Sequence, residues 1–68
     1  MAELGEELRR ERVRRNLTFK DIEQVLHIKT TYLEAIEDGN FAVIPGRVYA
    51  KGFIRNYGNY LGLDGERL

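Results

Sequence analysis

Six side chains suited to protein recognition recur within one short stretch near the C-terminal end of the chain. The aromatic ones are Tyr49, Phe53 and Tyr60, and the cationic ones are Arg47, Lys51 and Arg55. If this stretch is helical, at about 100° per residue, the three rings fall within roughly 40° of one another and form a seam along one edge. Aromatic and arginine side chains are the usual anchors of protein interfaces. The pattern predicts a protein-binding helix; the alternative is that Tyr49 and Phe53 only cover the core.

The residue types needed for catalysis are not arranged in any pattern typical of an enzyme. Cysteine is absent, His27 is the only histidine, and no glycine-rich phosphate loop follows a strand. We expect His27 to be a partly exposed turn residue. The neighbouring acids Glu37 and Asp38 precede a helix end. The sequence therefore predicts a protein that is not an enzyme and that uses no cofactor, metal ion or small-molecule substrate.

The alternative is a nucleic-acid partner, because the helix that we predict over residues 29–38 could enter a groove of DNA. Its outward positions would be Lys29, Thr30, Thr31 and Glu34. Residues 17–40 contain two lysines and five acids, a net charge of −3, whereas residues 41–63 contain three cations and no acid, a net charge of +3. DNA affinity depends largely on cationic contacts to phosphates. Glu34 and Asp38 would face a polyanion, so the sequence disfavours DNA.

Helices must position these side chains, since no segment alternates apolar and polar residues as a strand would. We predict helices over residues 4–15, 18–25, 29–38 and 46–61, and the start of a fifth at Asp64. Asn16 is suited to a left-handed helix end, and Thr18 with Asp21 resembles a capping box. Residues 1–68 are expected to form a single domain, with a helix-turn-helix unit at about 18–38 and the partner-binding helix at about 46–61. Because the fifth helix is cut short, we expect a longer protein.

The helical period also predicts the buried residues. They are Leu8, Ile22, Leu26, Leu33, Ile36, Ala50, Ile54, Tyr57 and Leu61. Tyr32 should point inward beside Leu33. The connector over residues 40–44 is expected to fill the core with its apolar side chains, Phe41, Val43 and Ile44. Pro45 should occupy the first turn of the fourth helix, where its missing N–H costs nothing.

Three segments carry a resemblance to a known family. LGEELR at 4–9, YLEAIEDG at 32–39 and above all IPGRVYAKGFIRNY at 44–57 are similar to the N-terminal cytoplasmic domain of the RodZ family, bacterial cell-shape proteins. General helix-turn-helix regulators lack the last run. The resemblance covers residues 4–64 and implies an all-α, lambda-repressor-like helix-turn-helix bundle. Asn16 departs from the family, which usually has glycine there.

The resemblance also implies a partner and a location. In the RodZ family the fourth helix docks on the actin-like filament protein MreB, through aromatic positions that correspond here to Tyr49 and Phe53. The family continues with a basic segment, a transmembrane helix and a periplasmic domain, so a cytoplasmic location and a membrane link through downstream segments are implied. Arg12 and Glu37 match positions that form a structural ion pair in phage-repressor-type domains. Related domains also include transcriptional regulators, which keeps DNA as the alternative partner.

Overall fold

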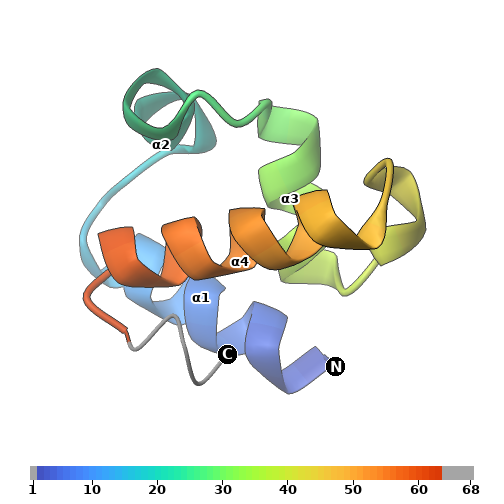
Figure 1. The fold of residues 1–68 in the computed structure, drawn as a ribbon. Coiled ribbons are helices and arrows are strands. Elements are labelled where there is room, and N and C mark those ends of the chain that lie inside the picture. The colour runs from blue at the N-terminus through green and yellow to red at the C-terminus, as the bar shows by residue number, and fades with distance from the viewer. Residues whose placement is uncertain (1, 64–68) are drawn as a thin grey trace.

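The computed structural model describes residues 2–63 of the chain, and these residues form four α-helices and one 3-10 helix (Figure 1). The elements are α1 (Ala2–Arg14), α2 (Phe19–Leu26), α3 (Thr30–Asp38), η1 (Phe41–Val43) and α4 (Arg47–Tyr60). No strand occurs in this range. The predicted all-α helix-turn-helix bundle is confirmed, with every helix end within two residues of its predicted position. The predicted fifth helix at Asp64 lies outside the described residues.

Local backbone chemistry explains where the first three helices begin and end. Asn16 adopts a φ of 57° just after α1, and Gly39 adopts 74° just after α3. The Thr18 hydroxyl accepts from the Asp21 N–H at 3.1 Å, and the Thr18 N–H donates to the Asp21 carboxylate at 2.9 Å. These two bonds form the predicted capping box and start α2. His27, with a φ of 58°, ends α2 in the left-handed region, and the chain turns there toward α3.

The connection into α4 differs from the prediction. Pro45 does not lie in the first turn, because α4 begins at Arg47 and Gly46 is its N-cap. Gly46 has a φ of 102°, a conformation that residues with a β-carbon rarely adopt. The glycine makes the sharp turn, and the proline precedes it.

The connector fills the core only in part. Ile44 is buried and Phe41 is half-buried, as expected, but Val43 is 47% exposed. The prediction for Val43 is therefore wrong. The reason is that the connector is not extended: residues Phe41–Val43 form the 3-10 turn η1, which points neighbouring side chains in different directions.

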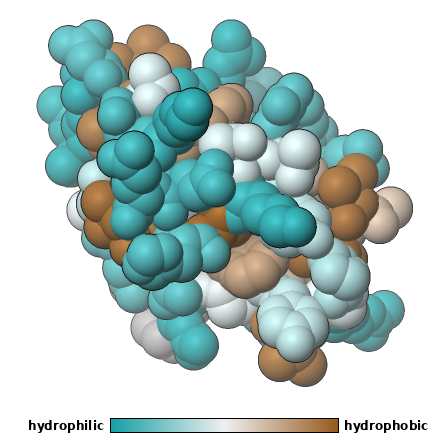
Figure 2. All heavy atoms as spheres, turned by 90° about the horizontal axis from the view of Figure 1, so that it is seen from above, coloured by the Kyte–Doolittle hydropathy of each residue, from teal (hydrophilic) through white to brown (hydrophobic). Residues whose placement is uncertain are grey.

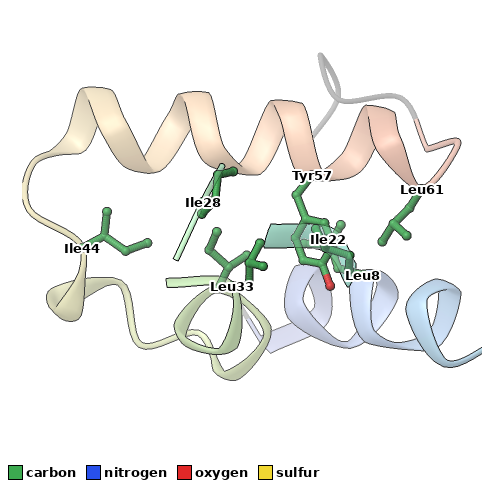
Figure 3. Close-up of a cluster of buried hydrophobic side chains, with 8 residues drawn as sticks. Leu8, Ile22, Ile28, Leu33, Ile44, Tyr57 and Leu61 are labelled. Carbon is green, nitrogen blue, oxygen red and sulfur yellow. The ribbon is translucent and has the colours of Figure 1, made fainter. Parts of the chain in front are cut away.

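The core lies between α4 and the other helices, and Figure 3 shows its side chains pointing into that space. It contains Leu8, Ile22, Ile28, Leu33, Ile36, Ile44, Tyr57 and Leu61. Six of the nine residues predicted to be buried are in this cluster. Leu26, Ala50 and Ile54 pack against it but are only partly buried. Ile28 was not predicted, because it lies in the turn between α2 and α3, outside any helical period.

A buried glycine sets the distance between α1 and α3. A β-carbon added to Gly5 would lie 2.1 Å from the backbone carbonyl oxygen of Glu37 and 2.9 Å from that of Ile36. Real β-carbons do not approach backbone oxygens so closely. The two helices therefore cross in direct backbone contact, and only glycine fits at this position.

We predict that Gly5→Ala destabilises the domain, although alanine favours helix over glycine by about 0.5–1 kcal/mol. Forcing an additional carbon into this contact should cost about 1–3 kcal/mol through a shift of the backbone. Urea or thermal unfolding followed by circular dichroism measures the change.

The matched control is Gly52→Ala in α4, where an added β-carbon meets nothing within 4 Å. That variant should be slightly more stable than the parent chain. Equal or higher stability for Gly5→Ala would show that α1 and α3 are not in close backbone contact.

Candidate protein-binding site

The predicted aromatic seam is not uniformly exposed. Tyr49 is 61% exposed, whereas Phe53 and Tyr60 are half-buried and pack against the core. Only the first of the three rings is therefore mainly available to a partner. Figure 2 shows pale and brown atoms gathered on one side of the molecular face, while hydrophilic atoms cover most of the other side.

Three rings from two helices form one continuous group, which we call the aromatic strip: Tyr32, Phe53 and Tyr49. Phe53 stacks on Tyr32 with ring centroids 5.7 Å apart and an interplanar angle of 20°. Tyr49 contacts Phe53 at 6.1 Å with the rings tilted by 36°. These separations are typical of favourable aromatic pairs. Tyr32 was expected to point inward; it is half-buried and packs against the core, and it also extends the seam of α4 onto α3.

Sequence reasoning missed the most exposed large apolar residue of the described chain. Val48, next to Tyr49 in the first turn of α4, is 84% exposed. At about 100° per residue it falls well outside the apolar arc of the helix, so the helical period gave no reason to consider it. Val48 is next to Tyr49 in the sequence, but the two side chains point about 100° apart around the helix.

The three cations lie on a different face of α4 from the aromatic strip. Arg47, Lys51 and Arg55 are all exposed. With a step of about 100° per residue they lie roughly 120–160° around the helix from Tyr49. Because a helix is only about 10 Å wide, their field still reaches the strip within a Debye length.

A buried polar network holds α4 against α1 and α3. Arg12 Nε lies 2.7 Å from Glu37 Oε2, and Arg12 Nη2 lies 3.2 Å from Oε1, so the ion pair that the resemblance implied is present and is bidentate. The Tyr57 hydroxyl donates a hydrogen bond to the same carboxylate. Arg12 also donates to the Leu17 carbonyl at 3.1 Å and lies 4.2 Å from the centre of the Phe19 ring.

The electrostatics of this network follow from its burial. Glu37 is only 8% exposed, so its charge needs the guanidinium beside it. The hydrogen bond to Glu37 raises the pKa of Arg12 above its ordinary value. Burial, followed by the bond to Glu37, raises the pKa of Tyr57 well above 10.0. Tyr57 therefore stays a neutral donor, and the network serves the fold and not catalysis.

The positions considered for DNA lie on the outer side of α3. Lys29, Thr31 and Glu34 are exposed, and Thr30 is half-buried. Asp38 is exposed at the end of the same helix. The outer face of α3 thus presents two carboxylates together with a single cation.

In the part of the chain that the structure describes, no group of His, Cys, Asp or Glu side chains is arranged to hold a metal ion. Nor is any helix in residues 2–63 both long and apolar enough to cross a membrane.

Comparison with known protein families assigns the chain to one of them. Residues 7–68 match the model of the helix-turn-helix domain family, and the chain belongs to this family. It is a family of non-enzymatic domains, which agrees with the expectation that the chain is not an enzyme.

A curated relative is also similar to the chain. It is the uncharacterized membrane protein YmfM of Bacillus subtilis (strain 168), which is 36% identical over 52 residues. The match covers 76% of this chain but only 18% of that protein, so the chain spans less than a fifth of the relative's length. No solved structure matches the chain.

We predict that Arg12→Ala destabilises the domain by about 3 kcal/mol, because it leaves the buried Glu37 carboxylate without its counter-charge. The control is Arg14→Ala, which removes an exposed ion pair with Glu11, 2.9 Å long, and should change stability little. Chemical unfolding of both variants gives the comparison. Equal stabilities would mean that the Glu37 charge is not buried in solution.

Proposed function

We propose that this domain is a non-catalytic protein-binding module of the RodZ type, and that the start of α4 docks on an MreB-like actin filament protein. Through segments beyond this chain it would link the filament to the membrane in bacterial cell-shape control. The observation that supports the proposal most is the exposure of Tyr49, 61%, at the outer end of the aromatic strip.

The apolar surface around Tyr49 is larger than that of a single exposed side chain. Single exposed apolar residues are normal on small proteins. Here Tyr49 is 61% exposed and continues into the stacked rings of Phe53 and Tyr32. Rigid aromatic rings supply much contact area for little loss of conformational entropy, which makes them suitable anchors at an interface.

Charge and context favour the same partner class. Residues 41–63 contain three cations and no acid, so α4 attracts a protein surface that carries carboxylates. The relative YmfM is described as a membrane protein and is much longer than this chain. That description supports a role beside a membrane, with the anchoring segment elsewhere in the protein.

The alternative function, DNA-binding transcriptional regulation, is favoured by membership of the helix-turn-helix family. The charge of α3 opposes it, since Glu34 and Asp38 are exposed on the helix that would enter the groove. We regard the protein-binding function as the better supported of the two.

For DNA, we expect no sequence-specific binding by this chain. Weak association with any duplex should come from Arg47, Lys51 and Arg55 and should disappear as salt rises, because phosphate contacts release counterions. Fluorescence anisotropy at low and physiological salt, with several unrelated duplexes, tests this. Submicromolar binding that selects one sequence at physiological salt would establish the regulator function instead.

For the filament protein, Tyr49→Ala should weaken binding by about 2 kcal/mol, roughly thirtyfold in Kd, as expected for a hot-spot residue. Its effect on stability should be small, because the ring is mostly exposed. Isothermal titration calorimetry with purified MreB-like protein, and unfolding of the free domain, measure the two effects. Phe53→Ala is the less clean variant, since it also removes the stack on Tyr32.

Two control variants show how the effects of Tyr49→Ala on binding and on stability should be interpreted. Val25→Ala removes another exposed apolar side chain, on α2, and should leave binding unchanged. Leu33→Ala truncates a fully buried side chain and should destabilise the domain by about 2–5 kcal/mol. Full-strength binding by Tyr49→Ala would place the docking surface elsewhere. Destabilisation as large as that of Leu33→Ala would make Tyr49 a core residue.

A further inference from the structure

The side of α4 that points away from the core carries two cations and one apolar side chain. Tyr57 of α4 is fully buried and points into the core (Figure 3). With a step of about 100° per residue, Val48 lies roughly 180° around the helix from Tyr57. Arg55 and Lys51 lie roughly 160° and 120° from Tyr57, on the same side as Val48. All three are exposed, and we call this group the outer face of α4.

The outer face of α4 is separate from the aromatic strip. Tyr49 is turned roughly 80° from Tyr57 in the opposite sense to Lys51, so that it lies about 100° from Val48. The strip continues from Tyr49 toward α3 through the stack of Phe53 on Tyr32. A protein seated on the strip therefore does not need to cover the outer face, which is available to a second partner.

We propose that the outer face of α4 lies against an anionic lipid bilayer, with Lys51 and Arg55 among the phosphate headgroups and Val48 in the apolar boundary beneath them. The proposal goes beyond the proposed function, on which it rests only for the presence of a membrane beside the domain. There the link to the membrane runs through segments outside this chain, whereas here the domain itself contacts lipid. The contact is peripheral, since none of the helices in residues 2–63 can cross a bilayer.

The distribution of charge favours this orientation. Residues 41–63 have a net charge of +3 and residues 17–40 a net charge of −3. An anionic surface therefore attracts α4 and repels the segment that contains α2 and α3. Each Lys or Arg held near an anionic leaflet strengthens the attraction roughly fivefold. The domain should approach the bilayer with α4 first.

The form of the outer face favours lipid over a folded protein. One exposed valine is ordinary by itself, but Val48 is 84% exposed on the same side of the helix as Lys51 and Arg55. A helix that lies on a bilayer places apolar side chains at the boundary of the acyl region. Long cationic side chains keep their charged ends at the headgroups while their methylene groups are buried. Lipids rearrange around a convex helix, whereas a protein partner needs a complementary surface.

The test uses tryptophan as a reporter, because the chain contains none. Val48→Trp is attached by a C-terminal hexahistidine tag to vesicles that contain nickel-chelating lipid, so that every molecule is held at the surface at high local concentration. Its emission should shift to shorter wavelength on vesicles of phosphatidylglycerol and phosphatidylcholine, and not on vesicles of phosphatidylcholine alone. Val25→Trp, which replaces an exposed valine of α2, should show no shift on either kind of vesicle.

A pair of charge reversals tests the cations. Lys51→Glu and Lys20→Glu make the same change in net charge, at exposed positions of α4 and α2. Sedimentation of the untethered chain with the anionic vesicles gives the partition constant. Lys51→Glu should lower it by about tenfold or more, because an attraction becomes a repulsion. Lys20→Glu should lower it by less than about threefold, since the negative segment that contains it is turned away from the bilayer.

The results that would overturn the lipid contact are distinct from failure of the proposed function. Equal emission shifts for Val48→Trp and Val25→Trp, or no shift for either, would exclude docking by the outer face. Equal losses for the two charge reversals would show that binding follows net charge alone and would also overturn it. A shift of Val48→Trp with the MreB-like protein and none with vesicles would assign the outer face to the filament protein. Full-strength filament binding by Tyr49→Ala would instead refute the proposed docking surface and leave the vesicle results unchanged.

Discussion

The structure depends on Glu37, whose side chain and backbone both join helices. Its buried carboxylate holds Arg12 of α1 and Tyr57 of α4, and its backbone carbonyl oxygen lies against Gly5 of α1. A buried ion pair adds little stability compared with a well-packed apolar substitute, but it tolerates few alternative arrangements, because an unpaired charge there is costly. We infer that this residue fixes how α1, α3 and α4 are placed, while apolar burial supplies most of the free energy of folding.

The placement of α4 determines what the proposed binding surface presents. Tyr57 must point inward to reach Glu37. Two turns earlier on the same helix, Tyr49 is offset from Tyr57 by roughly 80°, which moves it from the core to the flank. Phe53 lies between them and is held by its stack on Tyr32. Burial of one tyrosine therefore accounts for the exposure of the other, and the polar network and the surface are parts of one arrangement.

The helices and their ends could be predicted because they depend on local chemistry. The Thr18–Asp21 capping box and the left-handed residues Asn16 and Gly39 act within a few positions of the chain. The surface was less predictable, since exposure depends on what other helices cover. The helical period grouped Tyr49 with Phe53 but carried no information about Tyr32 on α3 or about the open space beside Gly52. Val43 was placed wrongly for a related reason: the 3-10 turn of η1 follows neither helix nor strand periodicity.

The distribution of charge explains how a helix-turn-helix fold can serve a partner other than DNA. A groove-reading helix needs cations toward the phosphates, yet α3 exposes Glu34 and Asp38. Three exposed cations and no acid lie on α4, which in this fold crosses the other helices (Figure 1). A folded protein with apolar and acidic groups can match both the rings and the charges of that surface. Under the proposed function, the cationic charge that DNA would need is missing from α3, while the aromatic strip and the cations of α4 suit a folded protein.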